Sequence, residues 1–469
     1  MEKFYLAVDI GASSGRHILG HLENGKIKLE EIYRFENGMD HKDGKLLWNV
    51  DRLFGEIVAG MRKCKELGKI PVSMAIDTWA VDYVLLDEQD RILGDTYGYR
   101  DHRTDGMDAE VAKILPETEL YAKTGIQKQI FNTVYQLMAV KQKEPELLQR
   151  AKTLLMLPDY FGLRLTGNKL SEYTNGSTTQ LVNPTTFQWD TDLIRKLGYP
   201  EDIFLPLQMP GTKVGQLLPK MQKEVGFDLE VVLCGSHDTA SAVMAVPQTS
   251  GDGIYISSGT WSLMGIESLK PIINGNAAAA NFTNEGGYDR RFRFLKNIMG
   301  LWMIQSVRHE YNDAYSFAQL CDMAEESKDF PSRVDVNDPS FLSPDSMVEV
   351  IKQYCQKTGQ QVPESVGELA SVVYCSLAQS YGETVSGLEK IAGRTYDGIH
   401  IIGGGSNAAY LNQLTADATG KTVYAGPGEA TAIGNLLAQM IYAEELTDLK
   451  SARQCVRDSF EIKTFVPAK

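Results

Sequence analysis

Two kinds of hydrophobic spacing alternate along the chain, and together they indicate an α/β fold. Short apolar runs bounded by Gly, Ser or Asp are typical of buried strands, and they occur at 4–11, 72–87, 231–236, 253–259, 400–405 and 422–425. Apolar residues spaced three and four apart are typical of helices, and they occur at 146–165, 366–393 and 429–445. Strands that alternate with helices in this way predict helices packed on sheets.

One pattern occurs twice: an extended segment, a glycine-centred turn rich in hydroxyl side chains, and a second extended segment. The copies read AVDIGASSGRHILG and IYISSGTWSLMGIE, with Gly11 aligned to Gly259. Each predicts a β-hairpin, and each opens one half of the chain. A chain of 469 residues is long enough to divide into domains, and Pro, Gly, Ser and Asp cluster at 243–253. The sequence therefore predicts two domains of duplicated fold, residues 1–245 and 246–469.

Composition narrows the possible partners. The net charge of −14 argues against a basic face for nucleic acid, and no apolar run approaches the ~18 residues that a membrane helix needs. The 6 cysteines are scattered without CxxC spacing, which favours buried thiols over disulfides or metal ligands. The N-terminus has no secretory pattern. We expect a cytoplasmic protein, a monomer or small homo-oligomer, with no nucleic-acid or membrane partner.

The two predicted hairpins have the chemistry of phosphate-binding turns. A turn of Gly, Ser and Thr presents backbone N–H groups and hydroxyls without bulky side chains, and such concavities bind phosphate oxygens. Asp9 lies in the first hairpin, where its charge would repel a phosphate directly. A divalent cation between Asp9 and the phosphate would remove this repulsion. Mg²⁺ suits such a position, since it prefers oxygen ligands and keeps several waters. This interpretation makes Asp9 a metal ligand; the alternative is a tight hairpin in which Asp9 caps its own turn.

A third glycine-rich turn follows the predicted strand at 400–405, in the sequence HIIGGGSNAAYLNQLTADATGKTVYAG. It predicts a helix capped by Ser406 or Asn407, and it also fits the dinucleotide pattern G-x-G-x-x-A. That pattern requires an acidic residue at the end of the next strand, where this chain has Gly426. A loop that accepts adenine or ribose against its backbone is therefore favoured over a dinucleotide site.

A candidate base lies in CGSHDTASAV, residues 234–243, where a predicted strand ends and an alanine-rich helix begins. α/β folds place their sites at this edge, and phosphoryl transfer to a hydroxyl needs a base beside that hydroxyl. Asp238 is favoured for this role because phosphoryl transfer depends mainly on positioning and charge neutralisation. The alternatives are His237 as the base and Asp238 as an ordinary acid at a helix N-terminus.

These four elements, in this order, resemble the FGGY family of sugar kinases, within the actin, hexokinase and Hsp70 superfamily of ATPases. VDIGASSGR and ISSGTWSLMG are similar to the two phosphate hairpins, IIGGGSNAAYLNQLTADATG to the adenosine segment and GSHDTASA to the segment of the catalytic aspartate. Further family-like segments are YRDHRT, LMLPDYFGLRLTG, SEYTNGSTTQLVNPTTFQWDTDLI and GPGEATAIGNLLAQ. The resemblance covers nearly the whole chain.

The resemblance implies two duplicated ribonuclease H-like (actin-like ATPase) domains around a central cleft. It also implies transfer of the γ-phosphate of ATP, with Mg²⁺, to a sugar hydroxyl, with Asp238 as the proton acceptor. The sugar contacts that it implies are Ala80, His237, Asp238, Thr239 and Asn297; the nucleotide contacts are Ala12, Ser13, Ser14, Gly15, Arg16, Thr260, Gln305 and Gly403.

The details of the resemblance favour a deoxy ketose as the sugar. A methyl in place of a hydroxymethyl needs apolar surface, for which Trp79, Phe131 and Trp302 are candidates; Asp82, Asp101, Arg103 and Asn297 are candidate polar walls. Core packing is the alternative for each aromatic residue. The family more often has Gly at the position of Ala80, whose methyl takes space beside the sugar. A kinase for another ketose such as L-fuculose, or a non-catalytic nucleotide-dependent sugar sensor, would show the same motifs.

Overall fold

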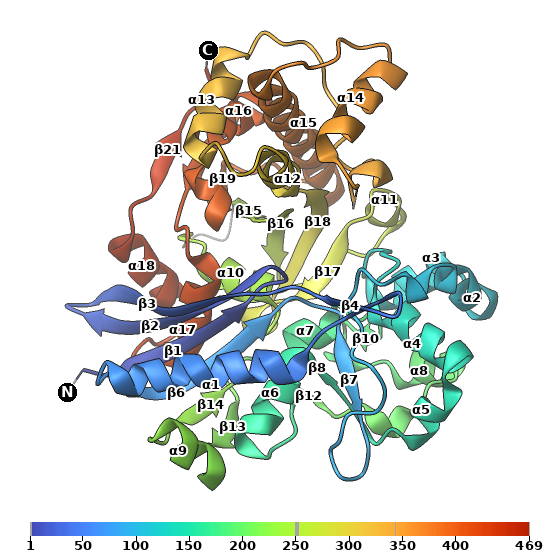
Figure 1. Cartoon of the computed structure of the whole chain (residues 1–469), viewed down its shortest axis with the longest axis vertical. Coiled ribbons are helices and arrows are strands. Elements are labelled where there is room, and N and C mark those ends of the chain that lie inside the picture. Colours follow the sequence, from blue (N-terminus) through green and yellow to red (C-terminus); the bar gives the residue numbers. More distant parts are fainter. Residues whose placement is uncertain (1, 249–252, 343, 469) are drawn as a thin grey trace. The chain divides into compact units, whose positions relative to one another are not determined.

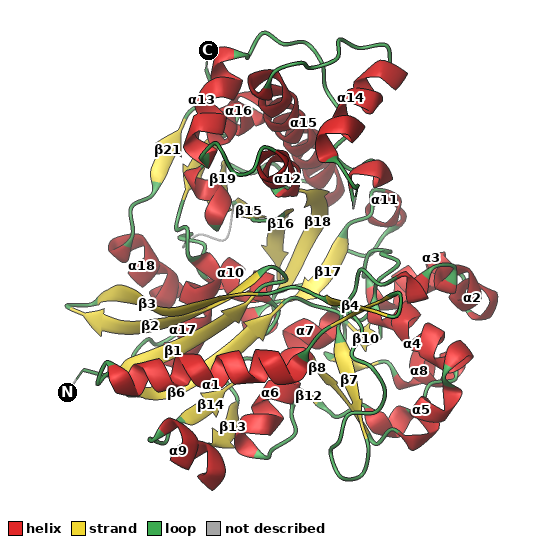
Figure 2. Cartoon of the chain, in the orientation of Figure 1, coloured by secondary structure: helices red, strands yellow, loops and turns green. Residues whose placement is uncertain are grey.

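The computed structural model describes residues 2–248, 253–342 and 344–468, which form two compact units that both combine strands and helices (Figure 1, Figure 2). Unit 1 comprises Met1–Ala245, Glu267–Phe294 and Thr431–Ser459, and unit 2 comprises Val246–Ile266, Leu295–Ala430 and Phe460–Lys469. Two segments from the second half of the chain therefore belong to unit 1. The division into residues 1–245 and 246–469 stays a prediction.

Unit 1 is built on a six-stranded sheet in the order β13-β14-β6-β1-β2-β3. The strands are β13 (Lys213–Gln216), β14 (Glu230–Val232), β6 (Pro71–Thr78), β1 (Phe4–Ile10), β2 (Ser14–Glu23) and β3 (Lys26–Glu36). β14, β6 and β1 run parallel, and β2 is antiparallel to β1. The carboxyl ends of three parallel strands therefore meet at one edge of the sheet, where α/β folds place their sites.

Side chains of β1 alternate between the two faces of this sheet, and a helix packs on each. Leu6 and Val8 are buried in a cluster with side chains of α1 (Val50–Glu66), which lies along the sheet in Figure 1. Tyr5 and Ala7 are buried on the other face against α17 (Ala430–Tyr442). A strand covered on both faces needs a continuous apolar run, so a charged residue in it, Asp9, must have a specific reason.

The rest of unit 1 consists of helices and short strand pairs. The helices are α2 (Met107–Ile114), α3 (Glu117–Thr124), α4 (Thr133–Lys143), α5 (Pro145–Arg150), α6 (Leu157–Thr166), α7 (Tyr173–Ser177), α8 (Thr191–Leu197), α9 (Pro219–Val225), α10 (Asp238–Met244), α11 (Gly275–Ala279) and α18 (Leu449–Ser459). The strand pairs are β4 (Asp40–Lys42) with β5 (Lys45–Leu47), β7 (Tyr83–Leu86) with β8 (Thr153–Met156), β9 (Ser171–Glu172) with β12 (Leu207–Gln208), and β10 (Val182–Asn183) with β11 (Gln188–Trp189).

A second sheet of seven strands has the order β17-β18-β16-β15-β19-β20-β21. Its strands are β17 (Thr283–Gly286), β18 (Phe292–Met299), β16 (Trp261–Ser268), β15 (Ile254–Ser258), β19 (Gly398–Ile402), β20 (Thr422–Ala425) and β21 (Lys463–Phe465). The helices of unit 2 are α12 (Trp302–Glu310), α13 (Phe317–Glu326), α14 (Met347–Lys357), α15 (Val366–Ala392) and α16 (Ala409–Thr419). β15 is antiparallel to β16 and parallel to β19, so β15 and β19 end at the same edge.

The structure confirms both hairpins, β1–β2 and β15–β16, and the strands predicted at 4–11, 253–259 and 422–425. It also confirms the helices at 366–393 and 429–445, observed as α15 and α17. The strands predicted at 231–236 and 400–405 are shorter, as β14 and β19, because the chain leaves each sheet at its carboxyl edge to form the loops discussed below. All six cysteines are free and buried, as expected. In the part of the chain that the structure describes, no helix is both long and apolar enough to span a membrane.

Two of the predicted elements are wrong. Residues 72–87 form two strands in different sheets, β6 and β7, because the backbone turns at Val81, where φ is 67°. Residues 146–165 form α5, β8 and α6 instead of one helix. The apolar run TLLM pairs with β7 as a buried strand, and Pro158 starts a new helix after it. A continuous apolar run does not distinguish a buried strand from a helix by spacing alone.

His17 is an unusual core residue of unit 1. Its side chain in β2 is 0% exposed, and its ring lies over Gly60 of α1, where an added Cβ would approach the ring to 2.2 Å. Burial lowers the pKa of His17 to about 4. The folded protein therefore holds this imidazole neutral in a pH range where the unfolded chain, with a pKa of about 6.5, takes up a proton.

This difference predicts a pH-dependent contribution to stability that is fully present above the unfolded pKa and is lost as pH falls from about 6.5 towards 4. Between pH 7 and pH 5 the free energy of unfolding should fall by about 2 kcal/mol more in the wild type than in His17→Gln. Urea denaturation at both pH values measures this difference. An equal fall in the two proteins would contradict the assignment.

Candidate functional site

Asp9 and Asp77 lie side by side at the carboxyl edge of the unit 1 sheet. The parallel register of β1 and β6 places Asp9 opposite Asp77, and the antiparallel register of β1 and β2 places Asp9 opposite Arg16. Nε and Nη2 of Arg16 donate to Oδ2 of Asp9 at 3.0 and 2.9 Å. From the sequence we expect Asp9 to bind the metal and Arg16 to contact the nucleotide. In the structure the two side chains form an ion pair with each other.

Asp77 is fully buried, and one of its oxygens has no hydrogen-bond partner among the described residues. Oδ2 accepts from Nδ2 of Asn435 at 2.6 Å, whereas Oδ1 is left without a donor. Burial, together with the charge of Asp9, holds the pKa of Asp77 well above its usual range. Two adjacent carboxyl groups, one with an unused acceptor, give this edge the oxygen chemistry that a hard cation prefers.

The segment after β14 brings Asp238 to the same edge. The backbone N–H of Thr78, at the end of β6, donates to the carbonyl oxygen of Ser236 at 2.9 Å. Asp238 then begins α10, and its Oδ1 accepts from the backbone N and from Oγ1 of Thr239 at 2.6 and 3.1 Å. Its side chain keeps 33% of its surface exposed. Thr239 therefore orients a carboxylate that a ligand can still reach.

The electrostatics around Asp238 favour proton uptake. Burial raises the pKa of Asp238; His237 opposes this shift, and the charge of Asp9 adds to it. A carboxylate with a raised pKa is a stronger base than an ordinary aspartate, and general bases work best when their pKa approaches the working pH. The Asp238 carboxylate can therefore accept a proton from a hydroxyl group placed beside it.

His237 is held by a buried ion pair from β17 and β18. Nδ1 of His237 lies 3.0 Å from Nη2 of Arg293 and 3.3 Å from Oε2 of Glu285, and Arg293 and Glu285 are 3.2 Å apart. Nε2 of His237 lies 3.4 Å from Oδ1 of Asp238. Burial would raise the pKa of Glu285, but the charges of Arg293 and His237 outweigh it and lower the pKa. His237 therefore lies between Asp238 on one side of its ring and the ion pair of Glu285 and Arg293 on the other.

The turn between β6 and β7 is conformationally strained. A φ of 67° is rare for a β-branched residue such as Val81. Its carbonyl oxygen accepts from Oγ1 of Thr133 at 2.7 Å and from Nε2 of Gln136 at 3.2 Å. Strained residues persist where their neighbours fix them, and they cluster at functional sites. The turn leaves Ala80 partly exposed.

Asp82 is buried beneath this turn. Its Oδ2 accepts from Nε1 of Trp48 at 2.6 Å, from Nε1 of Trp79 at 2.9 Å and from the backbone N of Tyr99 at 3.0 Å, while Oδ1 accepts from Nε2 of Gln136 at 3.1 Å. Burial raises the pKa of Asp82 to about 6, although these donors oppose the shift. Asp82 and Trp79, which the sequence suggested as walls of a sugar pocket, hold the turn from inside.

The other expected polar walls of unit 1 are also paired internally. Asp101 accepts from the backbone N of Arg103 at 2.7 Å and from that of Leu46 at 2.8 Å. The guanidinium of Arg103 stacks on the ring of Tyr97 at 4.0 Å. Phe131 is partly exposed instead, and so is Ala80. Arg103 also keeps part of its surface exposed, although its guanidinium is stacked on Tyr97.

The first hairpin turn, Ala12 to Gly15, is exposed at Ser13, and Asn37 holds it in place. Asn37 donates from its backbone N to the carbonyl oxygen of Ser13 at 3.0 Å and from Nδ2 to that of Gly11 at 2.8 Å. A Cβ at Gly15 would lie 2.1 Å from the ring of Phe35. Asn37 pairs the carbonyl oxygens that would otherwise repel a phosphate, and Gly15 has no room for a side chain.

Unit 2 brings a second turn and a glycine loop together. Thr260 lies at the turn between β15 and β16, and β19 runs parallel to β15 and continues into Gly403. Gly403 has a φ of 82°, and an added Cβ would lie 2.9 Å from the carbonyl oxygen of Ser258. This position tolerates only glycine without strain. The expected helix cap by Ser406 or Asn407 is wrong, because both lie in a 3-10 turn and α16 starts after Ala408 with no side-chain cap.

The remaining expected contacts also lie in unit 2. Oδ1 of Asn297 is buried and has no hydrogen-bond partner among the described residues. Gln305 is partly exposed on α12. Trp302 donates from Nε1 to the carbonyl oxygen of Phe341 at 3.2 Å and is partly exposed.

Comparison with solved structures identifies the fold. The fold matches a crystal structure of gluconate kinase from Lactobacillus acidophilus, with a TM-score of 0.80 at 15% identity over 100% of this chain and 94% of that one. It also matches glycerol kinase from Plasmodium falciparum with ADP, with a TM-score of 0.78 at 14% identity over 99% and 94% of the two chains. The fold is therefore that of the two-domain carbohydrate kinases, which confirms the expected fold class.

The family follows from the sequence comparisons. The N-terminal domain model of the FGGY family of carbohydrate kinases matches residues 4–245, and its C-terminal domain model matches residues 254–443. The chain belongs to the FGGY family of carbohydrate kinases. It is 53% identical to rhamnulokinase from Halalkalibacterium halodurans over 99% of both chains. It is 46% identical to rhamnulokinase from Bacillus subtilis over 99% of this chain and 95% of that one.

Three residues of the site were missed from the sequence. Asp77 carries the same signal as Asp9, a carboxylate inside an apolar strand, and could have been found by applying that criterion twice. Glu285 and Arg293 carry no such signal. They come from β17 and β18, far along the chain from His237, and only the fold brings them to it.

The Asp82 network predicts the effect of removing one donor. Trp48→Phe removes the indole N–H that donates to a buried carboxylate, which should cost about 1.5–3 kcal/mol of unfolding free energy beyond the loss of ring volume. Trp189→Phe is the matched control, because its Nε1 donates at 2.6 Å to the neutral carbonyl of Leu205. The cost at Trp48 should be larger at pH 8 than at pH 5, since Asp82 is charged above a pKa of about 6. Equal costs for both variants at both pH values, measured by urea denaturation, would contradict this role.

Proposed function

We propose that this enzyme transfers the γ-phosphate of ATP to O1 of L-rhamnulose, giving L-rhamnulose 1-phosphate and ADP in L-rhamnose catabolism. The substrate is inferred from relatives that are 43–53% identical over nearly the whole chain. The main support for the reaction type is the position of Asp238. Its carboxylate is oriented, partly exposed and placed at the carboxyl edge of a parallel sheet. We expect the enzyme in the cytoplasm, as a monomer or small homo-oligomer.

Asp238 accepts the proton of the O1 hydroxyl as that oxygen attacks the γ-phosphorus. The Thr239 backbone N–H fixes the carboxylate, which keeps the base in place before the sugar arrives and lowers the entropy cost of reaching the reactive geometry. His237 and Thr239 flank the sugar, together with Ala80 and Asn297. Arg16 offers positive charge to the transferring phosphoryl group.

The nucleotide is assigned to the two glycine turns and the Gly403 loop. Backbone N–H groups and hydroxyls of Ala12, Ser13, Ser14 and Gly15 suit the phosphates of ATP, as does Thr260. Gly403, which has no side chain to obstruct a ligand, and Gln305 are assigned to the rest of the nucleotide. These assignments predict that ATP binding depends on small residues at both turns.

Mg²⁺ fits the carboxylates at the edge of the unit 1 sheet. Among the residues that the structure describes, no group of three or more His, Cys, Asp and Glu side chains forms a complete metal site. A magnesium ion that arrives with nucleotide phosphates and retains waters needs only one or two protein carboxylates. Asp9 would hold it, and the unused oxygen of Asp77 lies beside Asp9. The ion supplies neutralisation of phosphate charge.

The sugar preference is assigned to the exposed residues around the strained turn. L-rhamnulose carries a methyl group at C6, and the apolar surfaces of Ala80 and Phe131 suit such a group. An apolar pocket discriminates only weakly against an added hydroxyl, by about 10²-fold in comparable cases. Some turnover of related ketoses is therefore expected.

A panel of acceptors tests the proposal: release of ADP from ATP and Mg²⁺ with L-rhamnulose, L-fuculose, L-xylulose, D-xylulose, glycerol or no sugar. We expect the highest kcat/KM with L-rhamnulose. A higher value with another ketose would keep the kinase and overturn the substrate. ATP binding without turnover of any acceptor would favour a nucleotide-dependent sugar sensor.

Asp238→Asn should reduce kcat by about 10²–10⁴-fold, because an amide cannot accept the hydroxyl proton. The dissociation constant for ATP, measured by isothermal titration calorimetry, should stay close to the wild-type value. Asp202→Asn, an exposed position outside the site, is the control and should retain full turnover. Turnover retained by Asp238→Asn would rule out the assigned base.

A further inference from the structure

The segment SEYTNGSTTQ, residues 171–180, is family-like in sequence but has no role in the reaction as derived above. It contains Glu172, whose side chain is 0% exposed. A buried carboxylate is costly unless several donors compensate for its lost hydration. The partners of Glu172 therefore indicate what this segment does.

Glu172 is a hydrogen-bond acceptor for two separate parts of the chain. Within its own segment, Oε1 accepts from the backbone N of Thr174 at 2.7 Å, and Oε2 accepts from Oγ1 of Thr174 at 2.6 Å and from the backbone N of Asn175 at 3.0 Å. From the other part, Ser236 donates to Oε2 through its backbone N at 3.2 Å and through Oγ at 2.6 Å. One carboxylate thus joins α7 to the residue two positions before Asp238.

Two further bonds extend this connection towards the base. The backbone N of His237 donates to Oγ1 of Thr174 at 3.3 Å, and Nδ2 of Asn175 lies 3.3 Å from the carbonyl oxygen of Ser236. The segment 172–175 therefore binds the backbone N of both residues that precede Asp238 and the carbonyl oxygen of Ser236. These contacts fix the backbone from which the Asp238 side chain projects.

Behind this contact lies a second carboxylate. The backbone N of Glu172 donates to both oxygens of Asp159 at 3.2 Å. Burial and the charge of Glu172 hold the pKa of Asp159 well above its usual range. Burial also raises the pKa of Glu172, although bonds from Ser236 and Thr174 oppose that shift. These bonds stabilise the charged form of Glu172, which accepts from all of its donors.

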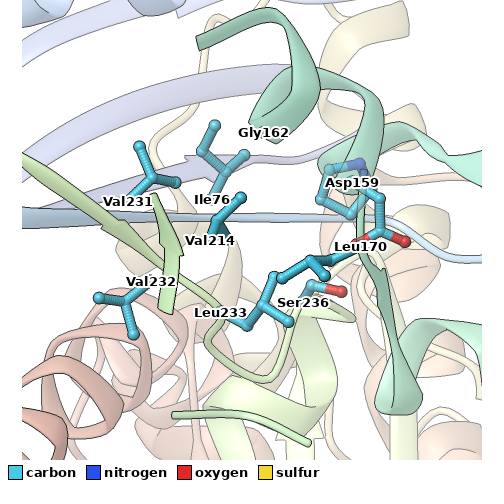
Figure 3. Close-up of a pocket in the computed structure, with 10 residues that line it drawn as sticks. Ile76, Asp159, Gly162, Leu170, Val214, Val231, Val232, Leu233 and Ser236 are labelled. Carbon is cyan, nitrogen blue, oxygen red and sulfur yellow. The ribbon is translucent and has the colours of Figure 1, made fainter. Parts of the chain in front are cut away.

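The space beside these residues excludes bulk water. Asp159 and Ser236 line a small pocket together with aliphatic side chains such as Ile76, Val214 and Val231 (Figure 3). Its volume of about 10 Å³ is at the lower limit for one water. Ser236 is 1% exposed and Glu172 is 0% exposed, so the bonds between them face little competition from solvent.

We propose that Glu172 and Thr174 are positioning residues for Asp238, which set the base within reach of the sugar hydroxyl through Ser236 and His237. This inference rests on the proposed function of Asp238. Misplacing a reacting group by about 1 Å can cost about 10²-fold in rate, so loosening this contact should lower kcat while leaving ligand binding nearly intact.

The test compares three threonine variants with wild type. Thr174→Val removes the hydroxyl that joins Glu172 to the backbone N of His237, Thr174→Ser retains it, and Thr178→Val removes a buried hydroxyl that donates only within its own turn, to the carbonyl oxygen of Asn175 at 2.7 Å. We expect Thr174→Val to lower kcat on L-rhamnulose by about 10- to 100-fold. Thr174→Ser and Thr178→Val should stay within about twofold of wild type, and the KM values for ATP and sugar should change little in all three.

Hydrogen exchange of the segment 230–240 provides a readout that does not depend on turnover. Thr174→Val should speed amide exchange of Ser236 and His237, while Thr178→Val should not. Equal kcat values and equal exchange for Thr174→Val and Thr178→Val would overturn the positioning role. Absence of turnover in the wild type with every sugar would instead overturn the proposed function, and the exchange data would still decide whether Thr174 holds the segment.

Discussion

The parallel register of β1 and β6 is the constraint on which the site depends, because it sets Asp9 and Asp77 against each other at the end of a buried strand pair. Asp238 adds a third carboxyl group whose pKa responds to Asp9. Like charges so close together are destabilising unless they are neutralised. Arg16 pairs with Asp9, Asn435 donates to Asp77, and the raised pKa of Asp77 removes part of the repulsion. A bound cation would relieve the remainder, as the proposed role of Asp9 requires.

A second theme is the use of buried acids to hold loops. Asp82 accepts hydrogen bonds from four donors beneath the strained turn at Val81. Glu172 accepts from Ser236 and from its own segment. Glu285 contacts Arg293 and His237. Each acid is costly to bury alone; several hydrogen bonds compensate for the burial of Asp82 and Glu172, and the charges of Arg293 and His237 compensate for that of Glu285. Removing one partner of such a group leaves the other uncompensated, which is why these positions affect both stability and geometry. Of the residues expected to touch the sugar, Ala80, His237, Asp238 and Thr239 lie on or directly beside the segments that these acids contact.

The sequence predicted the fold class and the elements with local signals. Glycine turns after apolar strands identified both hairpins, and a lone carboxylate in or after a strand identified Asp9 and Asp238. Other features depend on tertiary contacts that no local pattern records. The run TLLM became a strand because β7 pairs with it, and Asp82 became an internal anchor because Trp48 reaches it. Glu285 approaches His237 only through the arrangement of β17 and β18 in the folded chain.

The most direct test of the central claim is the identity of the phosphorylated product. C1 carries the primary hydroxyl of L-rhamnulose, since C6 is a methyl group. In a proton-coupled ³¹P spectrum of ATP, Mg²⁺, L-rhamnulose and enzyme, an ester at O1 therefore couples to two protons and appears as a triplet. The account predicts this triplet, growing in step with ADP. A doublet from an ester at a secondary hydroxyl, or inorganic phosphate alone, would contradict it.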